Sequence, residues 1–252
     1  MYIEQVLRPA KATNVDALTT EAQQRPENLC HLLRTLQPEQ LENLQTNSRV
    51  RSFQSGEAVY LPSEDAASVF LVLTGLVKVC HQTGGGRQAI LGFIESGEVF
   101  GERAIFDSPQ RDEYVEAVNE TTVMIIPTAI ITALMKQEND FTIELVKMFA
   151  QRRHRIERRI KNLLFSSNHE RLVHLLLELA EQFGVQLEDG ISFRIKISHQ
   201  ELASLIGSTR ETVTILLGQL KADGLITGGR RKIVLADLSR LRESVSRSVS
   251  MK

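Results

Sequence analysis

The sequence contains little cysteine, and this excludes two structural classes. Its 252 residues include only Cys30 and Cys80, too few for a disulfide framework or a quartet of metal ligands. It also has no apolar run of about 18 residues, so we expect no membrane-spanning helix and no membrane partner. The first residues lack the basic start and apolar stretch of a secretory signal. These absences together predict a cytoplasmic protein.

The sequence also lacks an overall excess of positive charge, but its charges are unevenly distributed. The formal net charge is −1, which argues against a uniformly basic nucleic-acid binder. Residues 191–233 nevertheless contain seven basic and three acidic residues, and residues 152–161 contain six basic residues and one acid. The second half of the chain therefore carries the local positive charge that a nucleic-acid surface needs.

Short apolar runs between residues 50 and 127 predict a β-domain. The runs AVYL, SVFLVL, GLVKVC and TTVMIIP are rich in β-branched residues and are separated by glycines. This spacing is typical of an all-β barrel or sandwich. Before it, residues 28–47 carry leucines at helical spacing with an interruption near Pro38, which predicts one or two short helices.

A long helix is predicted to begin near Asn139 and to carry a dimerisation seam. Apolar residues recur along it at the two seam positions of a heptad: Val146, Phe149, Ile156, Ile160 and Leu163. This pattern is typical of a coiled coil between two chains, here with Arg153 as the one charged seam member. The alternative is a single amphipathic helix that packs on its own domain. We expect a homodimer.

Residues 196–226 predict two short helices joined by a tight turn. Their sequence is KISHQELASLIGSTRETVTILLGQLKADGLI. Ser198, followed three residues later by Glu201, forms a capping box for the first helix. Gly207 supplies a turn position that is open to positive φ. Two helices joined in this way form a helix-turn-helix.

The second helix of this motif is predicted to place its N-terminal residues in the major groove of DNA. Ser208 is expected to start it, with Glu211 three residues later. The polar residues expected to contact DNA are Ser198, Ser208, Thr209, Arg210, Glu211 and Thr214. Arg210 can donate two hydrogen bonds to a guanine, whereas Glu211 can accept one from a cytosine amine or serve the helix cap. Arg210 has no acidic residue four positions later, because Thr214 stands there, so a surface ion pair is the weaker interpretation.

A glycine tip follows the second helix and carries three cations. Gly228 and Gly229 precede Arg230, Arg231 and Lys232. Cations on a flexible tip are suited to contact with phosphate groups, so this segment is predicted to be a wing that contacts the DNA backbone.

These motifs resemble the cyclic-AMP receptor/FNR family of transcription regulators over roughly residues 45–235. The stretch GSTRETVTILLGQL is similar to the recognition helix of that family, especially that of cyanobacterial nitrogen-control regulators. Gly56, Gly75, Gly97-Glu98 and Phe100-Gly101-Glu102 match its β-roll. The resemblance implies an α+β fold with an N-terminal cyclic-nucleotide-binding-like β-roll, a long dimerisation helix and a C-terminal winged helix-turn-helix. The expected parts are an arm at 1–27, the β-roll domain at 28–137, the dimerisation helix at 138–167 and the DNA-binding domain at 168–252.

The resemblance also implies a function. It implies a homodimeric DNA-binding transcription regulator, in which an effector pocket between the β-roll and the long helix controls DNA binding. Double-stranded DNA, a second copy of the chain and RNA polymerase would be its partners. Arg210 and Glu211 match base-reading positions of the family. Ile215, however, stands where cyclic-AMP-type receptors carry a further base-reading arginine, so the operator is expected to differ.

The alternative function is that of an interaction protein which acts by binding another transcription regulator. An enzyme is not expected, because no paired carboxylates, nucleophile–base set or metal-ligand cluster is evident in the sequence.

The family's phosphate-binding segment corresponds to residues 100–117, and it departs from the family pattern. The residues expected to line an effector pocket are Gly101, Glu102, Arg103, Arg111, Asp112, Arg152, Arg153 and Ile156. Gly101 and Glu102 can present backbone N–H groups at a helix start, which is a natural anion site. Arg111 stands where a phosphate-pairing arginine is expected. Asp112 and Glu113 follow it, and two carboxylates beside a phosphate repel it.

Cyclic AMP is therefore disfavoured as the effector. Ile156 and Glu157 also replace hydroxyl residues that reach the adenine in cyclic-AMP receptors. An iron–sulfur cluster would need several N-terminal cysteines, and only Cys30 is there. Haem is disfavoured because Cys80 and His81 are adjacent on a predicted strand and point to opposite faces. An acidic metabolite such as 2-oxoglutarate, a cyclic dinucleotide and no effector at all remain open.

Overall fold

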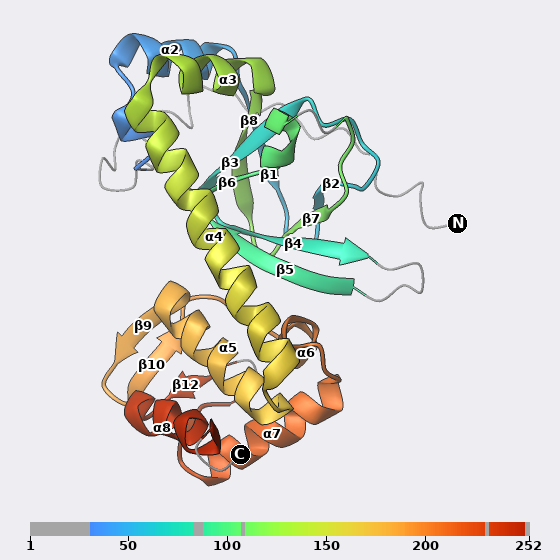
Figure 1. The fold of residues 1–252 in the computed structure, drawn as a ribbon, viewed down its shortest axis with the longest axis vertical. Helices are drawn as coiled ribbons and strands as arrows, with labels where there is room; N and C mark the ends of the chain where they lie inside the picture. The colour runs from blue at the N-terminus through green and yellow to red at the C-terminus, as the bar shows by residue number, and fades with distance from the viewer. Residues whose placement is uncertain (1–30, 83–87, 107–108, 230–231, 250–252) are drawn as a thin grey trace. The chain divides into compact units, whose positions relative to one another are not determined.

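The structure, a computed structural model, describes residues 31–82, 88–106, 109–229 and 232–249. The chain divides into two compact units. Residues 1–87 and 91–152 belong to unit 1, and residues 88–90 and 153–252 belong to unit 2. The boundary between Arg152 and Arg153 falls inside one continuous helix, α4 (Figure 1).

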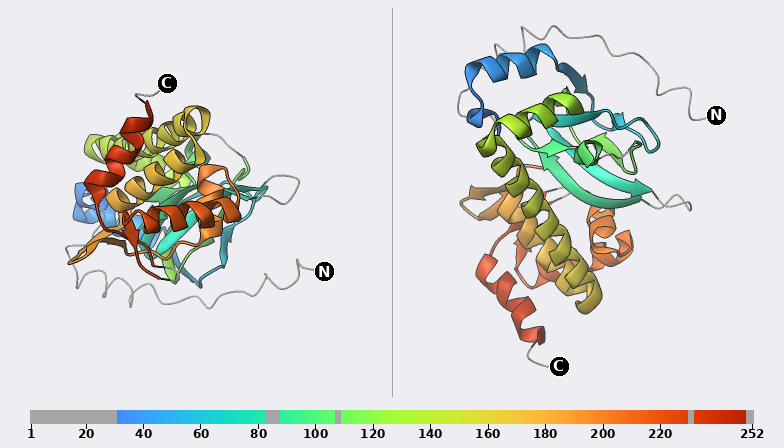
Figure 2. Two further views of the ribbon diagram at one scale, coloured as in Figure 1. Left: turned by 90° about the horizontal axis from the view of Figure 1, so that it is seen from below. Right: turned by 45° about the horizontal axis from the view of Figure 1, so that its top comes forward.

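Unit 1 contains two four-stranded sheets. One has the strand order β1-β8-β3-β6 and the other β2-β7-β4-β5. Figure 1 labels these strands, and Figure 2 shows the same ribbon from two further directions. The strands are β1 Arg49–Phe53, β2 Ala58–Tyr60, β3 Ser68–Thr74, β4 Leu76–Gln82, β5 Gln88–Glu95, β6 Val99–Phe100, β7 Tyr114–Ala117 and β8 Thr121–Pro127. The β-domain predicted from the short apolar runs is present.

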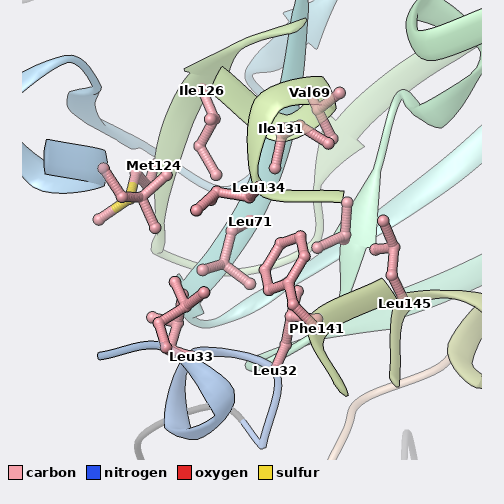
Figure 3. Packing of buried hydrophobic residues seen from close by; sticks show 13 residues of the cluster. Leu32, Leu33, Val69, Leu71, Met124, Ile126, Ile131, Leu134, Phe141 and Leu145 are labelled. Atoms are coloured by element: carbon pink, nitrogen blue, oxygen red, sulfur yellow. The ribbon is translucent and has the colours of Figure 1, made fainter. Parts of the chain in front are cut away.

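Strand β3 is buried on both of its faces. Phe70 and Val72 belong to a core made with residues of the second sheet. Val69 and Leu71 belong to a second core, which the helices of unit 1 complete (Figure 3). Successive side chains of a strand point to opposite faces, so one apolar run can serve both cores.

The helices of unit 1 supply the outer side of the second core. They are η2 Leu33–Thr35, α2 Pro38–Thr46, η3 Glu102–Phe106, α3 Thr128–Gln137 and the start of α4 Asn139–Phe165. Pro38 stands in the first turn of α2, where its missing N–H costs no hydrogen bond. Ile131, Leu134, Phe141 and Leu145 of α3 and α4 are buried in this core (Figure 3).

Unit 2 combines four further helices with a small sheet of order β11-β12-β10-β9. Its elements are α5 Asn168–Phe183, β9 Gly184–Leu187, β10 Gly190–Phe193, α6 His199–Ile206, α7 Arg210–Ala222, β11 Ile226–Thr227, β12 Val234–Leu235 and α8 Leu238–Val249. β9 and β10 pair as an antiparallel hairpin. Gly190 is required at its turn, because a Cβ there would lie 2.2 Å from the Leu235 carbonyl oxygen.

Among the described residues, no helix combines the length and the apolar composition needed to cross a bilayer.

Candidate DNA interface and effector site

The predicted helix-turn-helix is formed by α6 and α7 of unit 2. Ser198 caps α6 as expected: its Oγ accepts from the Glu201 N–H at 3.2 Å, and the Glu201 carboxylate accepts from the Ser198 N–H at 2.8 Å. Gly207 ends the helix with φ of 65°, in the left-handed region that favours glycine. The turn between the two helices is therefore specified by local sequence.

The start of α7 differs from the prediction by one residue. Thr209, and not Ser208, is the N-cap, and its Oγ1 accepts from the Thr212 N–H at 3.2 Å. Ser208 instead continues the turn, since its N–H donates to the Ala203 carbonyl at 2.9 Å. Glu211 consequently lies at the second helical position and does not complete a capping box. The capping role considered for Glu211 was wrong.

The N-terminal turn of α7 exposes the polar residues that were predicted to meet DNA. Thr209, Arg210, Glu211 and Thr214 are exposed, and Ser208 is half-buried. Val213, Leu217 and Leu220 are buried on the opposite side. Within the described ranges, the Arg210 guanidinium and the Glu211 carboxylate form no hydrogen bond or ion pair, so both are available to a ligand.

Thr214 is already engaged within the motif. Its hydroxyl donates to the Arg210 carbonyl at 2.9 Å. His199 Nδ1 lies 2.8 Å from the Thr214 hydroxyl oxygen. Because the hydroxyl proton is committed to Arg210, the geometry requires His199 Nδ1 to carry a proton and donate. Sequence reasoning missed His199; its only signal was its place as the first residue of α6.

The wing is described in part. Arg230 and Arg231 lie outside the described residues, and Lys232 is exposed. Lys221, near the end of α7, donates to the Gly228 carbonyl at 2.9 Å and so fixes the base of the wing. An open groove of about 400 Å³ lies beside Lys232 and is also lined by Arg194 and Lys196. The groove is basic, which suits a phosphate backbone.

In unit 1, Arg111 is held by protein atoms. Only 5% of it is exposed. Its guanidinium donates to the Gly101 carbonyl at 3.0 Å and to the Ser68 carbonyl, and it lies 4.6 Å from the centre of the Tyr60 ring. Gly101 has a φ of 72°, in the left-handed region that favours glycine, and a Cβ there would also lie 2.7 Å from Arg111 Nη1.

The other charged residues of the predicted effector site are matched by internal charges. Arg103 pairs with Asp112, and both are exposed. Arg152 pairs with Glu102 at 3.2 Å and donates to the Val99 carbonyl at 2.6 Å. The structure thus brings together six of the predicted residues in unit 1: Gly101, Glu102, Arg103, Arg111, Asp112 and Arg152.

Glu113 and Tyr60 form a further pair beside Arg111. The Tyr60 hydroxyl donates to the Glu113 carboxylate at 2.8 Å. Burial and the adjacent Glu113 carboxylate raise the pKa of Tyr60 far above its ordinary value, so the phenol stays protonated and continues to donate. Tyr60, like His199, was missed because its partner is distant in sequence.

The remaining predicted residues lie on α4. Arg153 and Ile156 belong to unit 2, and Arg153 pairs with Glu157 at 3.2 Å. Four seam residues are exposed in the single chain: Val146, Ile156, Ile160 and Leu163. Phe149 instead packs partly against the core of unit 1. Leu164 and Phe165, which the seam prediction did not include, are exposed at the end of the same helix.

Two arginines join α4 to the rest of unit 2. Arg159 pairs with Glu178 of α5 at 2.6 Å in a mostly buried contact. Arg171 of α5 donates to the carbonyls of Ser166 at 2.9 Å and Leu163 at 2.7 Å, and more distantly to that of Ile206 at 3.5 Å. Leu163 also lies against the helix-turn-helix turn, 3.0 Å from where a Cβ of Gly207 would be.

In the part of the chain that the structure describes, no three or more His, Cys, Asp or Glu side chains lie close enough together to hold a metal ion.

Comparisons with known proteins agree with this geometry. A family described as "Cyclic nucleotide-binding domain" matches residues 50–138, and one described as "Crp-like helix-turn-helix domain" matches residues 170–244. A global nitrogen regulator of Synechocystis sp. is 30% identical over 188 residues, which are 74% of this chain and 84% of that protein. Transcriptional regulator SdrP of Thermus thermophilus is 33% identical over 198 residues, 76% of this chain and 92% of that protein. The solved structure of FixK2 from Bradyrhizobium japonicum is similar with a TM-score of 0.69 and 25% identity, over 78% of this chain and 96% of that one.

Proposed function

The chain belongs to the CRP/FNR family of DNA-binding transcription regulators, and from this premise we propose that it binds a near-palindromic operator as a homodimer under the control of a small effector other than cyclic AMP. The family is not enzymatic. The proposed working parts are an arm at 1–27, an effector-sensing domain at 28–137, a dimerisation helix at 138–167 and a DNA-binding domain at 168–252. RNA polymerase is the proposed further partner, and the cytoplasm the proposed location.

The observation that carries the proposal is the free, exposed start of α7. Arg210 and Glu211 stand on a helix whose other side is buried, and no described residue occupies their charged groups. Arg210 can give two N–H donors to the N7 and O6 of a guanine, and Glu211 can accept from a cytosine amine. The proposed contacts to the DNA backbone are Ser208, Thr209 and the wing residues Arg230, Arg231 and Lys232. Ser198 could join them only by giving up a bond to Glu201, because its hydroxyl and its N–H both donate to that carboxylate at 2.8 Å. Thr214 is the proposed support of Arg210, because its hydroxyl already binds the Arg210 carbonyl.

Selection from a randomised DNA library tests this function. A symmetric dimer should select half-sites about one helical turn apart. Arg210→Ala should cost roughly 1–3 kcal/mol at the best site and relax the preference at one base pair per half-site. Lys232→Ala is the matched control: it removes a phosphate contact, so it should weaken all sequences about equally and flatten the dependence of affinity on salt.

Two results would count against the proposal. If the wild-type chain selects no sequence, it is not a sequence-specific regulator, and the interaction-protein alternative gains support. If Arg210→Ala keeps the full sequence preference, α7 does not lie in the groove as proposed.

The effector proposal is supported by the charges of unit 1. Among the described residues of the segment, Arg111 is the buried arginine, and its guanidinium already donates to the Gly101 and Ser68 carbonyls. Asp112 and Glu113 follow it directly in the chain, so a phosphate ester that approached Arg111 would meet carboxylates. Arg103 and Arg152 are already paired, so an effector that recruits them must carry acidic groups able to replace Asp112 and Glu102. The carboxylates of an acidic metabolite such as 2-oxoglutarate are such groups, whereas a cyclic dinucleotide would bring phosphate esters to the same site as cyclic AMP. Native mass spectrometry of the purified dimer, which detects a retained small molecule by mass, tests for the effector.

A further inference from the structure

The recognition helix α7 exposes one large apolar residue, Ile215. Its relative exposure is 62%, whereas Val213, Leu217 and Leu220 of the same helix are buried and Leu216 is half-buried. Single apolar residues on a surface are common and need no explanation by themselves. Any function of Ile215 therefore depends on its position on α7.

Ile215 follows Glu211 by four residues, so the two side chains share one face of the helix. Gly218, three residues further on, leaves this face open, because a Cβ there would have no atom within 4 Å. The neighbouring Thr214 has its hydroxyl committed to the Arg210 carbonyl and to His199. Between Glu211 and the exposed Gln219, which lies one turn beyond Ile215, this side of the helix therefore offers an aliphatic group and little hydrogen-bonding capacity.

An aliphatic side chain in the major groove has one matching chemical group among the four bases. The C5 methyl of thymine is apolar, whereas guanine, adenine and cytosine present donors or acceptors there. Placing Ile215 against those polar edges would leave their donors and acceptors without partners, which costs binding free energy.

We propose that Ile215 is a specificity-determining residue that reads the methyl group of a thymine. The inference rests on the proposed DNA-binding function and names one base of its operator. One helical turn from Glu211 to Ile215 is about 6 Å along the axis, and base pairs are stacked about 3.4 Å apart. The thymine therefore lies one or two base pairs from the pair that Glu211 contacts.

The test changes only the methyl group of the DNA. After the operator has been selected from the library, the thymine is replaced by deoxyuridine, and in a separate duplex by cytosine or 5-methylcytosine. Burial of one methyl group corresponds to roughly a fourfold change in affinity per half-site. We expect wild type to bind thymine about fourfold better than deoxyuridine, and 5-methylcytosine better than cytosine by a similar factor.

Two variants assign the effect to Ile215. Ile215→Ala should bind the thymine and deoxyuridine duplexes equally and keep its preference for guanine at the Arg210 position. Ile215→Val, which keeps the branched side chain, should retain most of the discrimination. Arg210→Ala should show the opposite pattern, with the guanine preference lost and the thymine-to-deoxyuridine ratio kept. Helix content measured by circular dichroism checks that the variants fold.

The outcomes separate this inference from the function on which it rests. If wild type selects an operator and depends on Arg210 but binds thymine and deoxyuridine equally, the methyl reading is overturned and DNA recognition stands. If Ile215→Ala keeps the discrimination, another residue or the stiffness of the DNA is responsible, and the inference is again overturned. If no operator is selected, both the function and the inference fail.

Discussion

Arginine side chains have three different uses in this chain, and their partners distinguish them. Arg111 is buried and donates to backbone carbonyls, Arg171 donates to carbonyls at the ends of two helices, and Arg210 is exposed with its guanidinium free of described partners. A guanidinium that is satisfied inside the protein stabilises the fold, whereas a free one on a helix start is available to nucleic acid. The side-chain environment, and not the residue type, assigns the role.

Arg171 is the residue for which we expect a local effect on stability. Its bonds to the Leu163, Ser166 and Ile206 carbonyls join the end of α4 to the helix-turn-helix. Arg171→Met keeps much of the side-chain volume but removes every donor. Lost bonds from a charged donor cost about 1–3 kcal/mol, so amides near residues 163–166 and 206–208 should exchange hydrogen roughly tenfold faster or more.

Hydrogen–deuterium exchange measures this effect without assuming that the two units unfold together. Arg158→Met is the matched control, since Arg158 is exposed and its nearest Glu181 oxygen is 3.8 Å away, a geometry that contributes little. Equal exchange rates in the two variants would show that Arg171 does not join these elements.

At the scale of elements, local signals predicted well and contacts between distant residues were not predictable. The Ser198 capping box and the Gly207 turn act within a few residues, so the sequence contains the whole signal. The start of α7 was misplaced by one residue because Ser208 and Thr209 are both good caps, and the choice depends on how the backbone leaves Gly207.

The pairing of candidate site residues could not be read from the sequence. Arg152 and Glu102 meet although 50 residues separate them, and their contact depends on the way that α4 packs on the β-domain. His199 and Thr214 likewise meet only because α6 and α7 cross. Sequence reasoning identified most of the charged residues of the site but not which charges neutralise each other.

Helix α4 carries the element-scale prediction, which is dimerisation through its exposed seam. Ile156→Glu combined with Ile160→Glu should give monomers, because two carboxylates per chain would meet their symmetry mates in the seam. Phe149 is a poorer choice for this test, since it packs partly in the core of unit 1 and its replacement would also disturb folding.

Light scattering after size-exclusion chromatography measures the mass directly. Val185→Glu serves as the control, because Val185 is also an exposed apolar residue but lies on β9. A double variant that elutes as an unchanged dimer would exclude this seam, and loss of the dimer in Val185→Glu would point to a different interface.

At the scale of the whole molecule, α4 is the helix that runs from one unit into the other. In unit 1 its Arg152 binds Glu102 and the Val99 carbonyl, and in unit 2 its Arg159 binds Glu178. An effector that competes for Arg152 in unit 1 therefore acts on the helix that continues into unit 2. By linkage, any such effector that changes DNA affinity must have its own affinity changed by DNA by the same factor.

The charges around Arg111 also predict which ligand the whole protein will not bind. Calorimetry should detect no binding of cyclic AMP at micromolar concentrations, because Asp112 and Glu113 would stand beside its phosphate and repel it, and the Arg111 guanidinium already donates to the Gly101 and Ser68 carbonyls. The double variant Asp112→Ser with Glu113→Gln tests that reason. It removes both negative charges, releases Arg103 from its ion pair and puts an amide oxygen at position 113, which can still accept from the Tyr60 hydroxyl. If the carboxylates prevent binding, the variant should bind cyclic AMP measurably more tightly than wild type. The same titration in the presence of DNA should then measure the coupling between the effector site and the DNA-binding site. Micromolar binding of cyclic AMP by wild type would refute the prediction. If the double variant also fails to bind cyclic AMP, the two carboxylates are not what prevents binding. The cause would then be that Arg111 already donates to the Gly101 and Ser68 carbonyls.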